Sequence, residues 1–225
     1  MDCRSTIPAI DQMRLYHFLP AQYALDDLTK GRLKLSKIDN LNDPFELWCS
    51  EQSDRQMRTA LRAWKKDISK KYGLLCFCAT WRSPLLWSHY ADRHKGICLG
   101  FDVRDDCVAK VHYVEKRTPL RLPLTEDSMQ RILFTKFSGW SYEEEWRAWF
   151  RLEECDSATS NHYFREFDED MMLSEVIVGP LSTVSKSALT KTIRGYSPRP
   201  RIMKARLAFN SFRIVKAQRR FRTKA

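Results

Sequence analysis

Residues 140–147, which read Trp-Ser-Tyr-Glu-Glu-Glu-Trp-Arg, place three adjacent carboxylates and an arginine between two tryptophans. If this segment is a β-strand, Glu143, Glu145 and Arg147 share one face, because side chains alternate between the two faces of a strand. Carboxylates two residues apart on one face lie roughly 7 Å apart, and each raises the pKa of the other unless a cation intervenes. Arg147 is a candidate for that cation. Such a pair of acids can stabilise developing positive charge and transfer protons.

The same segment also fits a surface helix in which Glu143 and Arg147 form a four-apart ion pair, an arrangement that needs no function. Its aromatic content favours a strand, since aromatic residues prefer a pleated, half-buried surface. We therefore expect Glu143 and Glu145 on a strand that lines a cleft. The opposite, apolar face of that strand would carry Trp140, Tyr142, Trp146, Ala148 and Phe150.

Mixed strands and helices are expected to position these side chains. Apolar periodicity, turn residues and helix-capping residues divide the chain. They predict strands at 15–19, 33–36, 74–80 and 97–103, helices at 20–29 and 50–72, and a turn at 40–46. Ser83-Pro84 predicts a further helix start, with the Ser83 hydroxyl as its cap and Gly96 as its end. The predicted fold class is α+β, built on a split, mostly antiparallel sheet with flanking helices.

Size and composition bound the organisation of the chain. Its 225 residues, 43% of them apolar, suffice for one α+β domain over residues 1–215, followed by a basic, poorly ordered tail at 216–225. The seven cysteines are scattered, so reduced thiols are expected rather than disulfides. No apolar run approaches the roughly 18 residues of a membrane span, and no signal peptide is recognisable. A cytoplasmic location with no membrane partner is expected.

Positive charge is concentrated at the C-terminal end. From Val176 onward there are thirteen Lys and Arg and no Asp or Glu, within a net charge of +11. This asymmetry predicts an anionic macromolecule as partner, with nucleic acid first, and the alternative is a merely solubilising tail. Interleaved phenylalanines favour nucleic acid, because rings stack on unpaired bases. The candidate nucleic-acid contacts are Arg199, Arg201, Lys204, Arg206, Arg219, Arg220 and Arg222.

Motifs for phosphate loops, nucleophile elbows and metal clusters are not found in the sequence. His89, His94 and Cys98 do not have the spacing of a zinc site. No metal cofactor is expected.

Three motifs together resemble the signature of a bacterial family known as domain of unknown function twenty-nine seventy-one. They are Asn-Asp-Pro-Phe-Glu at 42–46, Trp-Ser-His-Tyr-Ala at 87–91 and the carboxylate segment at 140–147. The resemblance covers residues from about Leu15 to Ile214 and implies no activity by itself.

A more distant resemblance is to ADP-ribosyltransferases of the poly-ADP-ribose polymerase and diphtheria-toxin type. It rests on Tyr16-His17 before a helix, on the strand, serine-capped helix and strand between 75 and 101, and on a carboxylate strand that comes third. The resemblance implies that NAD is the substrate. It implies ribose binding by His17, nicotinamide stacking on Tyr90 or Trp87, catalysis by Glu145 with Glu143 positioning the nucleophile, and further NAD contacts from Tyr16, Ser83 and Asn42. The chain departs from this pattern at Phe18, where those transferases have glycine.

The leading functional hypothesis is therefore NAD-dependent transfer of ADP-ribose to a macromolecule such as nucleic acid. The resemblance places such an activity in bacterial toxins or phage defence, with an inhibitor or antitoxin protein as a further partner. Two alternatives stay open. One is a non-catalytic module that binds nucleic acid or protein, in which His17 is a core histidine. The other is a hydrolase of a nucleotide or nucleic acid, with a metal held by Asp43, Glu143 and Glu145.

Overall fold

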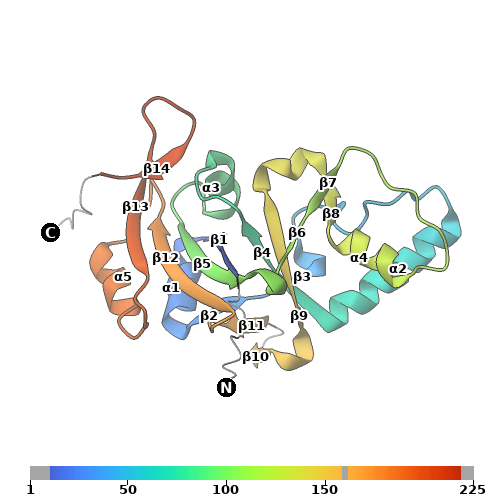
Figure 1. Cartoon of the computed structure of the whole chain (residues 1–225), viewed down its shortest axis with the longest axis horizontal. Coiled ribbons are helices and arrows are strands. Elements are labelled where there is room, and N and C mark those ends of the chain that lie inside the picture. The colour runs from blue at the N-terminus through green and yellow to red at the C-terminus, as the bar shows by residue number, and fades with distance from the viewer. Residues whose placement is uncertain (1–10, 159–161, 219–225) are drawn as a thin grey trace, which may run out of the picture.

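A nine-stranded sheet forms the centre of the computed structural model, which describes residues 11–158 and 162–218 (Figure 1). Every neighbouring pair of its strands is antiparallel except β12 and β13, which are parallel. The prediction of a mixed fold with a mostly antiparallel sheet is confirmed. The strand order is β14 (Ile214–Lys216), β13 (Arg201–Leu207), β12 (Met171–Val178), β5 (Ile97–Arg104), β1 (Gln12–Leu19), β4 (Tyr72–Cys78), β9 (Glu145–Arg151) and β6 (Ala109–Lys110), with β3 (Ser36–Lys37) paired to β4.

The sheet is nearly divided between β1 and β4. A single residue pair, Tyr16 with Cys78, joins these two strands. By contrast, β1 pairs with β5 along its whole length, and β4 pairs with β9 from Tyr72 to Cys78. Side chains from both strands therefore line the gap where the two halves of the sheet diverge.

Helices and smaller sheets surround the two halves (Figure 1). The helices are α1 (Ala21–Lys30), α2 (Arg55–Lys71), α3 (Pro84–Tyr90), α4 (Glu126–Leu133) and α5 (Lys186–Thr192). The smaller sheets are formed by β2 (Arg32–Lys34), β10 (Asp156–Ala158) and β11 (His162–Glu166), and by β7 (His112–Val114) with β8 (Thr135–Phe137). Four 3-10 turns, η1 to η4, span Ile38–Asn40, Asp105–Cys107, Ser138–Glu143 and Leu152–Glu154.

Alternation along the central strands builds two apolar layers. On one face, Leu15 and Leu99 pack with Ala24 and Leu28 of α1 and with Leu189 of α5. On the other face, residues of β1, β5, β12 and β13 pack under α3, namely Phe18, Cys98, Ile177 and Met203 with Leu86 and Trp87. A third cluster joins α2 and α4 to β4 through Leu61, Ile132 and Leu74. These layers hold both halves of the sheet in place around the gap.

Several predicted boundaries need correction. Helix 20–29 forms as α1 and ends where Gly31 adopts φ +65°, a left-handed conformation that suits glycine. The helix predicted at 50–72 starts only at Arg55, after the Asp54 cap, and it runs directly into β4 without a stop at Gly73. Helix α3 ends at Tyr90 rather than Gly96, because three residues with positive φ follow it, Asp92, Arg93 and His94.

At the C-terminal end, Lys216, which the sequence assigned to the tail, is the last residue of β14. Residues 219–225 lie outside the described part. The six cysteines that the structure describes are free thiols. Within residues 11–158 and 162–218, no helix is both long and apolar enough to cross a bilayer.

Candidate functional site

A cavity of about 910 Å³ opens at the gap between β1 and β4. Both halves of the sheet contribute side chains, with Tyr16 and His17 from β1 and with Cys76 and Cys78 from β4. Of the predicted site residues, the cavity brings together Tyr16, His17, Asn42, Tyr90, Glu143 and Glu145. Ser83 and Trp87 do not line it.

The two carboxylates converge by a route that differs from the predicted continuous strand. Glu143 ends the 3-10 turn η3, Glu144 takes φ +46° in the left-handed region, and β9 begins only at Glu145. From Glu145 onward the predicted alternation is present. Trp146, Ala148 and Phe150 pack into or against the main core, whereas Glu145 and Arg147 face away from it.

Trp140 and Tyr142 were wrongly placed on the apolar face of that strand. They belong to the 3-10 turn, and the Trp140 ring lies 5.1 Å from the Lys136 ammonium. The Trp140 and Tyr142 rings also lie against each other and against His89. Trp140 thus lies over the cation at the centre of the site instead of extending the sheet.

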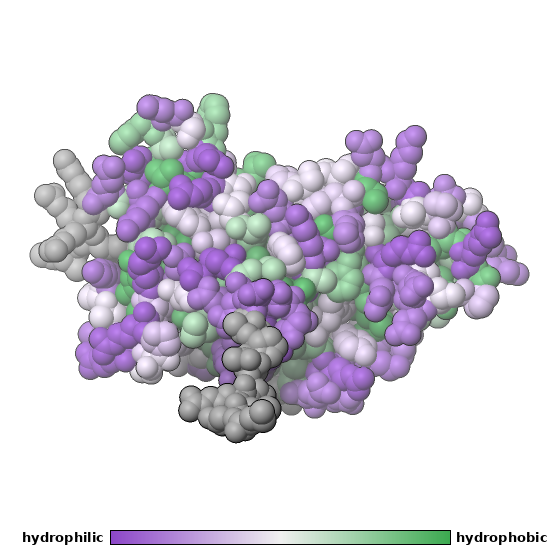
Figure 2. All heavy atoms as spheres, viewed as in Figure 1, coloured by the Kyte–Doolittle hydropathy of each residue, from purple (hydrophilic) through white to green (hydrophobic). Residues whose placement is uncertain are grey.

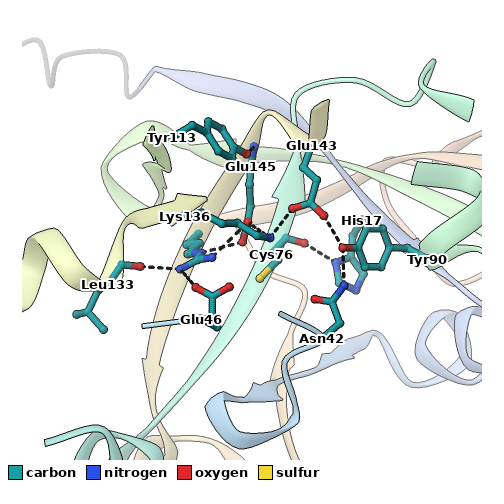
Figure 3. A network of polar contacts seen from close by, with 11 residues as sticks. His17, Asn42, Glu46, Cys76, Tyr90, Tyr113, Leu133, Lys136, Glu143 and Glu145 are labelled. Carbon is teal, nitrogen blue, oxygen red and sulfur yellow. Dashed lines mark hydrogen bonds and ion pairs between the residues drawn. The ribbon is translucent and has the colours of Figure 1, made fainter. Parts of the chain in front are cut away.

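Lys136 of β8 joins the two carboxylates (Figure 3). Its Nζ donates to Glu143 Oε2 at 2.5 Å and to Glu145 Oε2 at 2.8 Å. All three residues are no more than 5% exposed. A buried ammonium between two buried carboxylates offsets part of the repulsion that favours protonation of one of them.

Arg147 holds Glu145 from the other side. Its Nε donates to Glu145 Oε1 at 2.7 Å, and its Nη1 contacts Glu46 Oε1 at 2.8 Å and the Leu133 carbonyl at 2.7 Å. The backbone N–H of Glu145 donates to the Tyr113 hydroxyl at 2.9 Å. These contacts fix the orientation of the Glu145 carboxylate before any ligand binds.

The two carboxylates differ in proton affinity. Burial raises the pKa of Glu143, and its contacts with Lys136 and Tyr90 only partly oppose this shift. Burial acts in the same direction on Glu145, but Arg147 and Lys136 outweigh it and lower its pKa to about 2. With all groups ionised, the three carboxylates Glu46, Glu143 and Glu145 face two cations, which leaves one uncompensated negative charge.

Stability should depend on pH through Glu145. Its pKa is lower in the folded protein than the ordinary value of 4.5, so its ionisation stabilises the fold above pH 4.5, and this contribution is lost as the pH falls toward 2. The raised pKa of Glu143 acts in the opposite direction. In urea unfolding between about pH 5 and pH 3, we expect a smaller loss of stability for Glu145→Gln than for wild type. Glu144→Gln, at an exposed position, should keep the wild-type slope, and equal slopes in all three proteins would contradict this assignment.

Tyr90 connects Glu143 to the cavity opening. Its hydroxyl donates to Glu143 Oε1 and accepts a hydrogen bond from Asn42 Nδ2 at 3.0 Å (Figure 3). Burial and the neighbouring Glu143 charge raise the pKa of Tyr90, so the ring stays neutral. Tyr90 is half-buried and Asn42 is exposed, which puts a polar, reachable end on the buried network.

His17 spans the gap between the two halves of the sheet. Its Nδ1 lies 2.8 Å from the Cys76 carbonyl, and because a carbonyl can only accept, Nδ1 carries the proton. Burial lowers the pKa of His17, which favours the neutral ring. In that form Nε2 is an acceptor for a hydroxyl group.

Cations gather at another part of the cavity wall, around β2 and β3. Lys30, Arg32, Lys34 and Lys37 line it there, and the Arg32 guanidinium lies 3.7 Å from the centre of the Phe164 ring. Asp26 pairs with Lys30 at 2.8 Å. Burial raises the pKa of the neighbouring Asp27 to about 7. The cavity thus has a cationic region and a region dominated by carboxylates.

Other predicted positions have different environments. Trp87 is fully buried, stacks edge-on against Phe18 at 5.2 Å and donates from Nε1 to the Trp81 carbonyl at 2.6 Å, so it cannot cover a ligand in the cavity. Ser83 precedes α3 but makes no capping hydrogen bond. Asp43 accepts from the Phe45 backbone N–H at 2.9 Å. The described residues contain no group of three His, Cys, Asp or Glu side chains arranged to bind a metal.

The predicted nucleic-acid contacts have unequal environments. Arg199 is exposed, and Arg201 pairs with Glu175. Lys204 Nζ donates to the Gly179 and Ser182 carbonyls at 2.6 and 2.7 Å, so its ammonium is engaged within the fold. Arg206 donates to the Leu207 carbonyl at 2.8 Å. Arg219, Arg220 and Arg222 lie outside the described residues.

Two important site residues were not singled out from the sequence. Lys136 lies seven and nine residues before the carboxylates, and Glu46 lies about a hundred residues before Arg147. The one available signal for Lys136 was a cation between apolar neighbours in Phe134-Thr-Lys-Phe137. Glu46 was part of the motif at 42–46, but the sequence assigned no role to it.

Comparison of the chain with protein-family models, with curated proteins and with solved structures found no match.

Proposed function

We propose that this protein cleaves NAD and transfers its ADP-ribose to a macromolecule. The observation that carries the proposal is the convergence of His17, Tyr90, Glu143 and Glu145 from three distant chain segments on one cavity. Its volume of about 910 Å³ falls within the range of roughly 300–1,000 Å³ that is typical of small-molecule sites.

The charge of the site suits this reaction. Breaking the bond between ribose and nicotinamide develops positive charge on the sugar. With all groups ionised, the buried cluster around Lys136 and Arg147 carries one excess negative charge, and its donors already fix it in place. Fixed charges aimed at the developing charge stabilise a transition state without a cost of reorganisation.

The two differently charged regions of the cavity suit the two parts of NAD. The carboxylate-rich region favours the positively charged nicotinamide ribose, while Arg32, Lys34 and Lys37 can face the pyrophosphate. The Tyr90 ring offers a cation–π contact to the pyridinium. The neutral His17 ring can accept a hydrogen bond from a ribose hydroxyl at Nε2.

In this proposal, nicotinamide leaves with the electron pair of its bond to ribose C1′, and a nucleophile of the acceptor forms the new bond to C1′. Glu145, oriented by Arg147, stabilises the sugar in the transition state. Glu143, whose raised pKa favours proton uptake, accepts the proton of the nucleophile. Lys136 keeps both carboxylates ionised until Glu143 accepts this proton.

The test is incubation of the protein with NAD labelled in its adenylate part and with total cellular nucleic acid and protein. We expect label in the macromolecular fraction and an equal amount of released nicotinamide. The double variant Glu143→Gln/Glu145→Gln serves as the inactive control, and Glu144→Gln is the matched active one. Wild type that neither releases nicotinamide nor transfers label at millimolar NAD would contradict the proposal.

The second candidate is a non-catalytic nucleic-acid-binding module. The specific observation in its favour is the absence of any Asp or Glu after Val176, against thirteen basic residues. Under this alternative the buried carboxylates are structural. It predicts binding of nucleic acid by a protein that is inert toward NAD.

A further inference from the structure

The loop between β13 and β14 exposes two aromatic rings. Phe209 is 88% and Phe212 98% exposed, the largest values among the large hydrophobic side chains that the structure describes. The loop is closed by a hydrogen bond of 2.9 Å from the Ala208 N–H to the Arg213 carbonyl. It projects beside α3 at the upper left of Figure 1, and Figure 2 shows hydrophobic atoms there among hydrophilic ones.

Cations lie beside these rings. The Arg206 guanidinium lies 4.4 Å from the centre of the Phe209 ring. A second cavity, of about 380 Å³, is lined by Arg82, Arg201 and Lys216. The Ile214 N–H donates to the Arg82 carbonyl at 2.9 Å, which ties the Arg82 loop to β14. In the part of the chain that the structure describes, no carboxylate forms an ion pair with Arg82 or Lys216.

The one carboxylate in this second cavity is already neutralised. Glu175 Oε1 contacts Arg14 Nη1 at 3.2 Å and also pairs with Arg201. Its Oε2 accepts from the Tyr16 hydroxyl at 3.4 Å. Glu175 therefore does not cancel the attraction of the other cations for an anion.

The second cavity adjoins the proposed NAD cavity. Tyr16 lines both of them, and it sits at the residue pair with Cys78 that joins the two halves of the sheet. Tyr16 is thus shared between the cavity that contains Arg82 and Lys216 and the cavity that contains Glu143 and Glu145.

We infer that Arg82, Arg201, Phe209, Phe212 and Lys216, the hairpin surface, bind single-stranded nucleic acid and present it as the acceptor of ADP-ribose. The second half of this inference rests on the proposed function. Exposed rings stack on unpaired bases, and adjacent cations contact phosphates, which is the usual design of single-strand sites. A bilayer could meet the rings but not the cations inside the cavity, and a duplex offers no free base faces to the rings.

The transfer step on this acceptor is balanced. The bond between C1′ and the nicotinamide nitrogen breaks, and nicotinamide leaves neutral with the electron pair. A nitrogen or oxygen of an unstacked base forms the new bond to C1′, and its proton passes to Glu143. No further reactant is needed.

The binding test uses fluorescent oligothymidylate and oligouridylate of about 12 nucleotides, within the range of known site sizes. Phe209→Ala and Phe212→Ala should each weaken binding roughly 5- to 150-fold, the range of base–aromatic stacking. Arg82→Gln/Lys216→Gln should lower the slope of log affinity against log salt by about 1.4, since two phosphate contacts are lost.

Two controls match these variants. Phe45→Ala removes another exposed phenylalanine with an arginine, Arg117, near its ring, and Lys66→Gln/Lys70→Gln removes two exposed cations of α2. Both should leave binding unchanged. Equal losses in test and control variants would overturn the inference, as would binding of duplex or of phosphatidylserine vesicles that matches or exceeds single-strand binding.

Activity separates this inference from the proposed function. We expect label from NAD on the oligonucleotide. In Phe209→Ala/Phe212→Ala this label should be reduced, whereas nicotinamide release without acceptor should be unchanged. Single-strand binding by a protein that never releases nicotinamide would overturn the proposed function and the acceptor role, and leave the binding surface standing. Nicotinamide release with label only on protein would overturn the acceptor role alone.

Discussion

Replacement of Arg147 with methionine is expected to lower the free energy of unfolding by about 3–5 kcal/mol, the usual cost of removing one partner from a buried ion pair. Arg147 is 1% exposed and is the shared partner of Glu145 and Glu46. Without it, Glu46 loses its cationic partner, Glu145 keeps only Lys136, and the Leu133 carbonyl loses its donor. Methionine has a similar volume but offers no charge or hydrogen bond.

The measurement is urea unfolding at neutral pH. Arg151→Met, at the exposed end of the same strand, is the matched control and should leave the free energy of unfolding nearly unchanged. A change below about 1 kcal/mol in Arg147→Met would show that the buried network does not hold the site together.

Glu145→Gln is expected to reduce nicotinamide release by about 10²- to 10³-fold, the typical effect of removing one oriented electrostatic group from an active site. Glutamine keeps the shape of the side chain but removes the negative charge that faces the sugar. Because Arg147 and Lys136 then lack their shared partner, the folded state of the variant has to be verified by circular dichroism before rates are compared.

Glu143→Gln should affect the reaction differently. We expect nicotinamide release to persist while transfer to an acceptor falls by about 10²- to 10⁴-fold, the range for a lost general base. Glu144→Gln, between the two sites and exposed, should retain both activities. Equal losses of release and transfer in Glu143→Gln and Glu145→Gln would contradict the separate roles.

The part of the site set by local sequence could be predicted. Alternation from Glu145 to Arg147 follows from strand geometry once β9 is recognised, and the apolar neighbours identify the face that packs into the main core. Gly31 similarly marks the end of α1, because its left-handed conformation favours glycine.

The predictions that failed concerned features that depend on the tertiary structure. Glu143 left the strand because Glu144 adopts a left-handed conformation, for which the sequence Glu-Glu-Glu gives no signal. Trp87 was an alternative to Tyr90 for stacking on nicotinamide, but the packing of α3 on β1 and its contact with Phe18 bury it. Lys136 could not be linked to its partners because β8 pairs only with β7, in a two-stranded sheet separate from the sheet that contains β9.

The convergence of distant segments was also beyond prediction from composition. The NAD resemblance suggested that His17, Tyr90 and Glu145 should meet, but the split between β1 and β4 that creates the cavity depends on strand pairing. The cationic wall of the cavity also depends on strand pairing, since Lys34 and Lys37 come from strands of two different sheets.

The most direct test of the central claim is a crystal structure of the Glu145→Gln variant with NAD. We expect the nicotinamide ring against Tyr90, a ribose hydroxyl within hydrogen-bond distance of residue 145, and the pyrophosphate near Arg32 and Lys34. NAD bound at another place, or no NAD in the cavity between β1 and β4 at millimolar concentration, would contradict the account.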